Sequence, residues 1–176
     1  MINTRPATLH DAAAIAKVHI GGWRSTYQGI VPQSYLDRLS YEKRQAMWAD
    51  ILSKKDTDSV HMVATDEHDN IIGFISAGKA RNQELGYDAE LYALYVSSEH
   101  QGQGIGKQLM HRLAELLTQH NFHSMYLWVL EKNPSRQFYR KMGAQLFVQT
   151  KTADFDGYQL TEVAYGWNDL KSLLNR

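Results

Sequence analysis

The spacing of apolar residues along the chain predicts alternating helices and strands. Apolar side chains recur every three to four positions over 104–120, which is typical of an amphipathic helix. An alanine-rich helix is expected after the capping-box pattern of Thr8–Asp11, and further helices are expected over 40–53, 134–142 and 167–175. Short apolar runs rich in β-branched and aromatic residues predict strands over 2–8, 59–65, 71–78, 90–96, 124–130, 144–151 and 158–166.

The order of these elements predicts a mixed sheet. Early strands are joined by short polar turns such as 66–70, whereas crossovers occur only around the two later helices. We therefore expect an α/β fold of the α+β kind, with a mixed, mostly antiparallel sheet of about seven strands and helices on both faces. Pro6 favours an edge position for the first strand. Neither a repeat nor a linker interrupts residues 1–176, so a single domain is expected.

Three glycines stand between a predicted strand and the long helix that follows it, in the segment from Leu94 to Lys107. Glycine lets a backbone approach an anion closely, and the first amides of a helix have no partners inside it. The helix dipole adds to this preference for a phosphate group. A Walker loop is excluded, because Gln101 and Gln108 stand where that motif needs a glycine and a hydroxyl. A dinucleotide fingerprint is also excluded, because Lys107 replaces its last glycine.

The pattern that does fit is Gln-x-x-Gly-x-Gly, read at 101–106. A second pattern, Asn-x-x-Ala-x-x-Phe-Tyr-x-Lys-x-Gly-Phe, begins at 133, with matches at Asn133, Phe138, Tyr139, Lys141 and Gly143 and departures at Arg136 and Ala144. Together with the strand before the first pattern, these segments resemble the GNAT superfamily of N-acetyltransferases, most strongly over about 71–147. Asn133 and Pro134 are also residue types that open a helix, and Gly143 is the type that ends one.

The resemblance implies that acetyl-coenzyme A is the cosubstrate. No metal is expected, because the histidines show no metal-binding spacing. It implies a bulged strand whose backbone at Leu94, Tyr95 and Val96 pairs with pantetheine, with the Val96 amide polarising the thioester carbonyl. The other implied cofactor contacts come from the glycine-rich turn and the second pattern: Gln101, Gly102, Gln103, Gly104, Ile105, Gly106, Lys107, Asn133 and Arg136. The amine is implied to attack directly, without a covalent enzyme intermediate.

Two residues are candidates for the catalytic acid and base. The second pattern implies that Tyr139 protonates the departing thiolate, since the reference pKa values of thiol and phenol, about 8.5 and about 10, differ little. The alternative for Tyr139 is a core position. Glu90, at the start of the key strand, is the candidate base for the acceptor amine. Its alternative is an ordinary strand-end carboxylate that faces water.

The acceptor pocket is expected from the segment that follows the first helix, with Trp23, Arg24, Tyr27 and Tyr35 as candidates. About half of the aromatic residues there are expected to be core instead. Small-molecule and peptide amines both stay open as acceptors. The other function considered is a non-catalytic acyl-CoA-binding sensor or subunit with the same fold, and an amine panel assayed for transfer separates the two.

Composition narrows the partners further. The formal net charge is zero, so a general electrostatic hold on nucleic acid or on an anionic membrane is not expected. The chain has no cysteine, which excludes disulfides and thiolate metal sites, and its eight histidines lack a metal-binding spacing. Neither a long apolar stretch nor a signal peptide is evident, so a cytoplasmic location is expected. The oligomeric state is left open, with a homodimer as one option.

Overall fold

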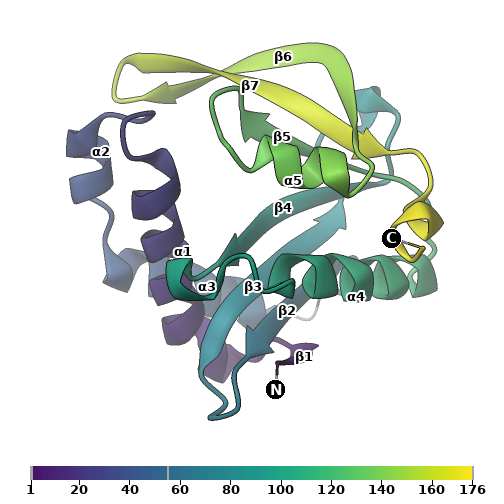
Figure 1. Ribbon diagram of the computed structural model, residues 1–176, viewed down its shortest axis with the longest axis horizontal. Coiled ribbons are helices and arrows are strands. Elements are labelled where there is room, and N and C mark those ends of the chain that lie inside the picture. The colour runs from purple at the N-terminus through teal and green to yellow at the C-terminus, as the bar shows by residue number, and fades with distance from the viewer. Residues whose placement is uncertain (1, 55, 176) are drawn as a thin grey trace.

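The computed structural model describes residues 2–54 and 56–175, and its centre is one seven-stranded sheet (Figure 1). The strands are β1 (Asn3–Pro6), β2 (Ser59–Thr65), β3 (Ile71–Lys79), β4 (Ala89–Val96), β5 (Met125–Leu130), β6 (Gln145–Phe155) and β7 (Tyr158–Trp167). Their order across the sheet is β1-β2-β3-β4-β5-β7-β6. Strands β4 and β5 pair in parallel, and every other neighbouring pair is antiparallel. The expected mixed sheet is confirmed, with β1 at its edge.

Helices cover both faces of the sheet. Helices α1 (Ala12–Tyr27) and α3 (Tyr41–Ser53) pack on one face, and the short α2 (Gln33–Asp37) connects them. Helices α4 (Ile105–Gln119) and α5 (Arg136–Lys141) pack on the other face (Figure 1). No helix in the described part of the chain is both long and apolar enough to cross a membrane.

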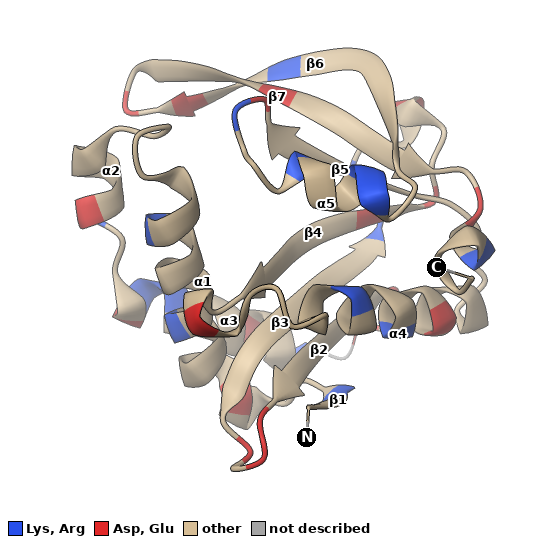
Figure 2. Ribbon diagram, viewed as in Figure 1, with Lys and Arg blue, Asp and Glu red and all other residues tan. Residues whose placement is uncertain are grey.

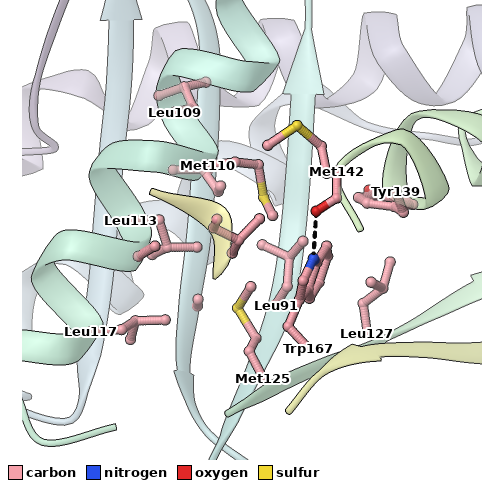
Figure 3. Packing of buried hydrophobic residues seen from close by; sticks show 14 of the residues in the cluster. Leu91, Leu109, Met110, Leu113, Leu117, Met125, Leu127, Tyr139, Met142 and Trp167 are labelled. Atoms are coloured by element: carbon pink, nitrogen blue, oxygen red, sulfur yellow. Dashed lines mark hydrogen bonds between the residues drawn. The ribbon is translucent and has the colours of Figure 1, made fainter. Parts of the chain in front are cut away.

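The larger core lies beneath α4, where the apolar stripe of the helix meets the sheet (Figure 3). Leu109 and Leu113 of α4 and Met125 of β5 have no exposed surface there. Trp167, at the end of β7, fills the space between the sheet and α5, and its indole N–H donates to the carbonyl of Met142 at 2.8 Å. Burial of these side chains supplies most of the favourable free energy of folding and fixes α4 and α5 on the sheet.

The turn that opens α1 is held by Asp11, as the capping-box pattern predicts. Its carboxylate accepts a hydrogen bond from the amide of Thr8 at 2.7 Å, and two from the guanidinium of Arg5 at 2.8 and 2.9 Å. The hydrogen bonds from Arg5 lower the pKa of Asp11 to about 2. This network joins β1 to the start of α1.

Three local predictions differ from the structure. The short helix α2 forms in a segment for which no element was predicted. Helix α5 begins at Arg136 rather than at 134, because the side-chain oxygen of Asn133 accepts from the amide of Ser135 at 2.8 Å and closes a turn before the helix. The segment 167–175 contains a short 3₁₀ turn, Leu170–Leu173, in place of a longer helix.

Strand β4 separates from β5 partway along its length. The two strands pair at Ala89–Met125 and Glu90–Tyr126, and the recorded pairing ends there. On its other side, β4 remains paired with β3, but the register shifts so that Tyr92 is an extra residue between two successive pairs. Such a bulge twists and bends its strand. The rest of β4 therefore turns one backbone edge towards an opening between the strands.

Candidate active site

A cleft of about 600 Å³ occupies this opening. Its walls come from the separated parts of β4 and β5, the turn before α4, and α5. The cleft is lined by most of the predicted cofactor contacts: Leu94, Tyr95, Val96, Gln101, Gly102, Gly104, Ile105, Gly106, Lys107 and Asn133. Tyr139 lines it as well, whereas Gln103 and Arg136 are not among its lining residues.

The glycines of the turn form an open cradle at the start of α4. Gly102 and Gly104 have φ angles of +77° and +81°, a region that side-chain-bearing residues rarely adopt. An added Cβ at either position would meet no other heavy atom within 4 Å, so the space in front of them is empty of protein. Gly106 is different, because its Cβ would approach the ring of Phe138 on α5 to 3.3 Å. Gly102 and Gly104 thus permit the turn, and Gly106 permits the close contact of α4 with α5.

The first turn of α4 presents unpaired amides to this cradle. The amide of Gln108 bonds back to the carbonyl of Gly104 at 3.0 Å, so the amides of 105–107 precede the first such bond. The side chain of Gln101 donates to the carbonyl of Val96 at 3.2 Å and ties the turn to the end of β4. With Lys107 beside it, this helix start favours an anionic group (Figure 2 shows the basic segments of α4 and α5).

Arg136 is directed away from the cleft. Its guanidinium donates to the hydroxyl of Tyr165 at 3.2 Å and also bonds the carbonyl of Glu131. Gln103, likewise outside the cleft lining, reaches the carbonyl of Glu99 at 3.4 Å. The positions of Arg136 and Gln103 therefore do not support their predicted contacts with the cofactor.

Three tyrosines and one asparagine meet at the inner part of the cleft. The hydroxyl of Tyr27 interacts with that of Tyr95 and accepts a hydrogen bond from the Asn133 side chain at 3.2 Å. Tyr139 lies beside them and is 7% exposed. Tyr139 therefore satisfies both interpretations of its position: its ring packs in the core, and the residue also lines the cleft.

Burial changes the acid–base properties of these phenols. It raises the pKa of Tyr139, and it raises the pKa of Tyr95 well above its usual value. The close match of reference pKa values between a phenol and a thiol therefore does not describe this site. A buried thiolate is destabilised by the same low-polarity surroundings, so both pKa values shift in the same direction. Tyr139 remains a protonated hydrogen-bond donor throughout the physiological pH range.

Glu90 is neither exposed nor part of the cleft lining. Its side chain is 2% exposed, and its oxygens accept hydrogen bonds from Arg81 and from the hydroxyl of Tyr126, the latter at 2.8 Å. The alternative interpretation of Glu90, a strand-end carboxylate that faces water, is therefore wrong. Burial opposes the charge, but the hydrogen bonds from Arg81 and Tyr126 outweigh it, and the pKa of Glu90 lies below its usual value. A carboxylate held in this way is a weak base.

Three of the four candidates for the acceptor pocket lie together: the ring of Trp23 is 4.6 Å from that of Tyr27 and 6.0 Å from that of Tyr35, centroid to centroid. Tyr27 lines the cofactor cleft. Tyr35 packs edge-on against Phe155, with ring centroids 5.1 Å apart, and belongs to an apolar cluster. Arg24 donates to the carbonyl of Leu39 at 3.3 Å. Trp23 borders a second cavity.

This second cavity, of about 490 Å³, lies between α1, α3 and strands β2 to β4; we call it the α1–α3 cavity. It shares Tyr92, Ala93 and Tyr95 with the cofactor cleft, so β4 forms a common wall. His19 and Arg44, which no sequence motif singled out, project into its lining. Within 2–54 and 56–175, no three His, Asp or Glu side chains gather in a way that would hold a metal ion.

Known proteins of similar sequence and fold are acetyltransferases. Residues 23–144 match the model of the Acetyltransferase (GNAT) family. The chain is 42% identical over 179 residues to YuaI, an uncharacterized N-acetyltransferase of Bacillus subtilis (strain 168), with 100% of each chain covered. It is 26% identical over 160 residues to a spermidine N(1)-acetyltransferase of Thermoplasma acidophilum, covering 89% of this chain and 92% of that one. The fold matches the crystal structure of PaiA N-acetyltransferase from Thermoplasma acidophilum in complex with coenzyme A, with a TM-score of 0.71 and 23% identity over 93% of this chain and 98% of that one.

Proposed function

Because the chain belongs to the GNAT family of acetyltransferases, we propose that it transfers an acetyl group from acetyl-coenzyme A to an amine by direct attack. The observation that carries this proposal is the cleft between the separated strands β4 and β5, which ends at the glycine cradle of α4. A strand edge free to pair, followed by a helix start that favours an anion, suits a ligand with an amide-bearing arm and a pyrophosphate.

The residues of the cleft fit acetyl-coenzyme A. The open space at Gly102 and Gly104 admits a phosphate close to the backbone, and the amides at the start of α4 are there to bind it. The unpaired edge of β4 around Leu94 to Val96 is suited to hydrogen-bond the amide groups of pantetheine. A solved relative in fold, PaiA N-acetyltransferase, was crystallised with coenzyme A.

When bound, acetyl-coenzyme A supplies a thioester that is activated towards amines. A bond forms between the amine nitrogen and the acetyl carbon, the bond from that carbon to sulfur breaks, and one amine proton is released. We assign the backbone amide of Val96 to polarising the acetyl carbonyl. Tyr139 donates a hydrogen bond to the departing sulfur, or donates its proton and then regains one from solvent.

Deprotonation of the acceptor needs a route that Glu90 alone does not provide. An alkylamine with a pKa near 10.4 is neutral in only about one molecule in a thousand at pH 7.4. Glu90 has to leave its ion pair with Arg81 before it accepts a proton, and its lowered pKa makes it a poor acceptor. We therefore assign the proton to water at the cleft mouth.

The experiment is a transfer assay with the purified protein, acetyl-coenzyme A and a panel of amines. Thiol release is followed continuously, and the acetylated amine is identified by mass spectrometry. We expect release that depends on the amine and equals the amide formed. A protein that binds acetyl-coenzyme A but acetylates no amine would instead act as a sensor or subunit, and the proposal would fail.

A further inference from the structure

The α1–α3 cavity contains a buried histidine whose protonation state is fixed by its neighbour. The indole N–H of Trp48 donates to Nδ1 of His19 at 3.1 Å. An indole nitrogen is a donor only, so Nδ1 carries no proton. Burial, assisted by the charge of Arg44, lowers the pKa of His19 to about 3, and the ring is neutral. Its single proton is therefore on Nε2.

The Nε2–H of His19 faces a second donor. Nη1 of Arg44 lies 3.4 Å from Nε2, and a guanidinium carries donors and no acceptor. Two N–H groups do not bond each other, so this contact satisfies neither of them. His19 is 7% exposed, which leaves its N–H almost without access to bulk water. A polar group buried in this way calls for an acceptor, and the adjacent positive charge calls for an anionic one.

The other charged groups around the cavity are already compensated. Lys54 pairs with Asp50 at 2.7 Å, and Arg81 pairs with Glu90. The carboxylate of Asp56 accepts from the amide of Asp58 at 2.9 Å and from a neighbouring serine hydroxyl. In the described chain, no carboxylate is paired with Arg44, so its charge remains for a ligand that enters the cavity.

The position of this donor pair relates it to the reaction. The α1–α3 cavity and the cofactor cleft share Ala93 and Tyr95 as wall residues. The ring of His19 lies 4.9 Å from that of Tyr95, centroid to centroid. A small molecule held at the donor pair is thus one strand away from the cleft in which the acetyl group is expected. Trp23, Met47 and Trp48 give the rest of the cavity an apolar surface.

We propose that His19 and Arg44 bind the carboxylate of the acceptor, so that the substrate is an amine that also carries a carboxylate and an apolar or aromatic portion. This inference rests on the proposed transferase function and specifies its substrate class. A polyamine would place a second ammonium beside Arg44 and would be repelled. The chain therefore differs in preference from its relative named for spermidine.

The first test compares matched acceptors: α-amino acids, the same amino acids as amides, the amines that lack the carboxylate, and spermidine. We expect kcat/KM to favour the acids in the wild-type protein. Arg44→Gln should lower kcat/KM for the acids by about 10- to 100-fold, which is the loss expected when one hydrogen bond to a charged group is removed. The same substitution should have little effect on kcat/KM for the amides. Lys43→Gln removes the same charge from an exposed neighbouring position on α3 and should leave the preference unchanged.

The second test does not depend on activity. Histidine-labelled protein is examined by ¹H–¹⁵N NMR while phenylacetate or phenylacetamide is added as the probe. We expect a neutral His19 protonated at Nε2, whose resonance shifts with phenylacetate and not with phenylacetamide, and a loss of this response in folded Arg44→Gln. Protonation at Nδ1, or no response to phenylacetate, would overturn the proposal.

The two proposals fail in different ways. If amines are acetylated but carboxylate-free acceptors are preferred, or Arg44→Gln leaves the preference intact, the carboxylate site is refuted while the transferase survives. If no amine is acetylated and yet phenylacetate shifts His19 in an Arg44-dependent manner, the transferase is refuted and an anion site remains, no longer assigned to an acceptor.

Discussion

Replacing Tyr139 by phenylalanine removes one hydroxyl from the cofactor cleft and preserves the packing of the ring. The ring makes edge contacts with Phe138 and Trp167, at centroid distances of 5.4 and 6.4 Å, and phenylalanine retains both. No described residue hydrogen-bonds the hydroxyl of Tyr139. Its loss should therefore change the free energy of unfolding by no more than about 0.5 kcal/mol.

The catalytic effect of Tyr139→Phe should be much larger than its effect on stability. If the hydroxyl protonates or hydrogen-bonds the departing sulfur, the chemical step should slow by about 100-fold or more, equivalent to about 2.7 kcal/mol. Affinity for acetyl-coenzyme A should change little, because the glycine cradle and the edge of β4 are intact. Saturation kinetics followed by thiol release, together with one calorimetric isotherm, measure the two effects separately.

Three outcomes of this experiment differ in which constant changes. A fall in affinity at constant saturated rate would make the hydroxyl a cofactor anchor. An unchanged saturated rate, with chemistry shown to be rate-limiting, would remove Tyr139 from the mechanism. Tyr158→Phe is the matched control, because that tyrosine is 52% exposed on β7 and should affect neither constant.

The remaining predictions concern the cradle, the core and the N-terminal turn. Gly104→Val should weaken acetyl-coenzyme A binding in calorimetry while the protein stays folded, because φ is +81° and the new side chain would occupy the cradle; unchanged affinity would contradict the assigned cradle. Trp167→Phe should lower the free energy of unfolding by about 1–3 kcal/mol, since it leaves the Met142 carbonyl buried without its 2.8 Å donor (Figure 3); an unchanged denaturation midpoint would disprove this role. Asp11→Asn should cost about 2 kcal/mol at pH 7 in chemical denaturation, because the pKa of Asp11 is lowered from 3.8 to about 2. A lowered pKa stabilises the fold fully above the unfolded value and less as pH falls, so the difference between wild type and Asp11→Asn should shrink below about pH 4 and nearly vanish at about pH 2; a difference that does not depend on pH would refute this linkage.

Local sequence signals predicted the parts of the fold that depend on neighbouring residues. The glycines of 102–106 require positive φ angles or close packing, and they stand where those features occur. Gly143 ends α5 with a φ of +85°, as its residue type predicts. The long apolar stripe of α4 likewise predicts its position over the core, because a helix with one apolar face has to bury that face.

Predictions failed where two local interactions compete. Asn133 is equally suited to cap a helix or to close a turn two residues ahead, and the structure uses the turn. The 167–175 segment is too short for its helical preference to outweigh tertiary contacts. Glu90 was predicted to be the base because it lies at the start of β4, and the pattern of that strand does not indicate that Arg81, nine positions earlier, hydrogen-bonds its carboxylate.

The residues of the α1–α3 cavity are brought together by tertiary contacts that no local sequence pattern indicates. His19 and Arg44 are 25 positions apart on two helices, and they meet only because α1 and α3 pack side by side on the sheet. Neither residue belongs to a motif. The tautomer of His19 depends on a third residue, Trp48, which a sequence reading would assign to the core. The proposed carboxylate site is therefore a product of tertiary packing.

Thermal melting of the purified protein with acetyl-coenzyme A tests the assigned cofactor cleft most directly. A ligand that binds only the folded state at 100 times its dissociation constant adds about 2.7 kcal/mol of stability. For a chain of this size we expect a rise in Tm of roughly 5–10 °C. The rise should be much smaller in Gly104→Val. Absence of any shift in the wild-type protein at millimolar acetyl-coenzyme A would contradict the account.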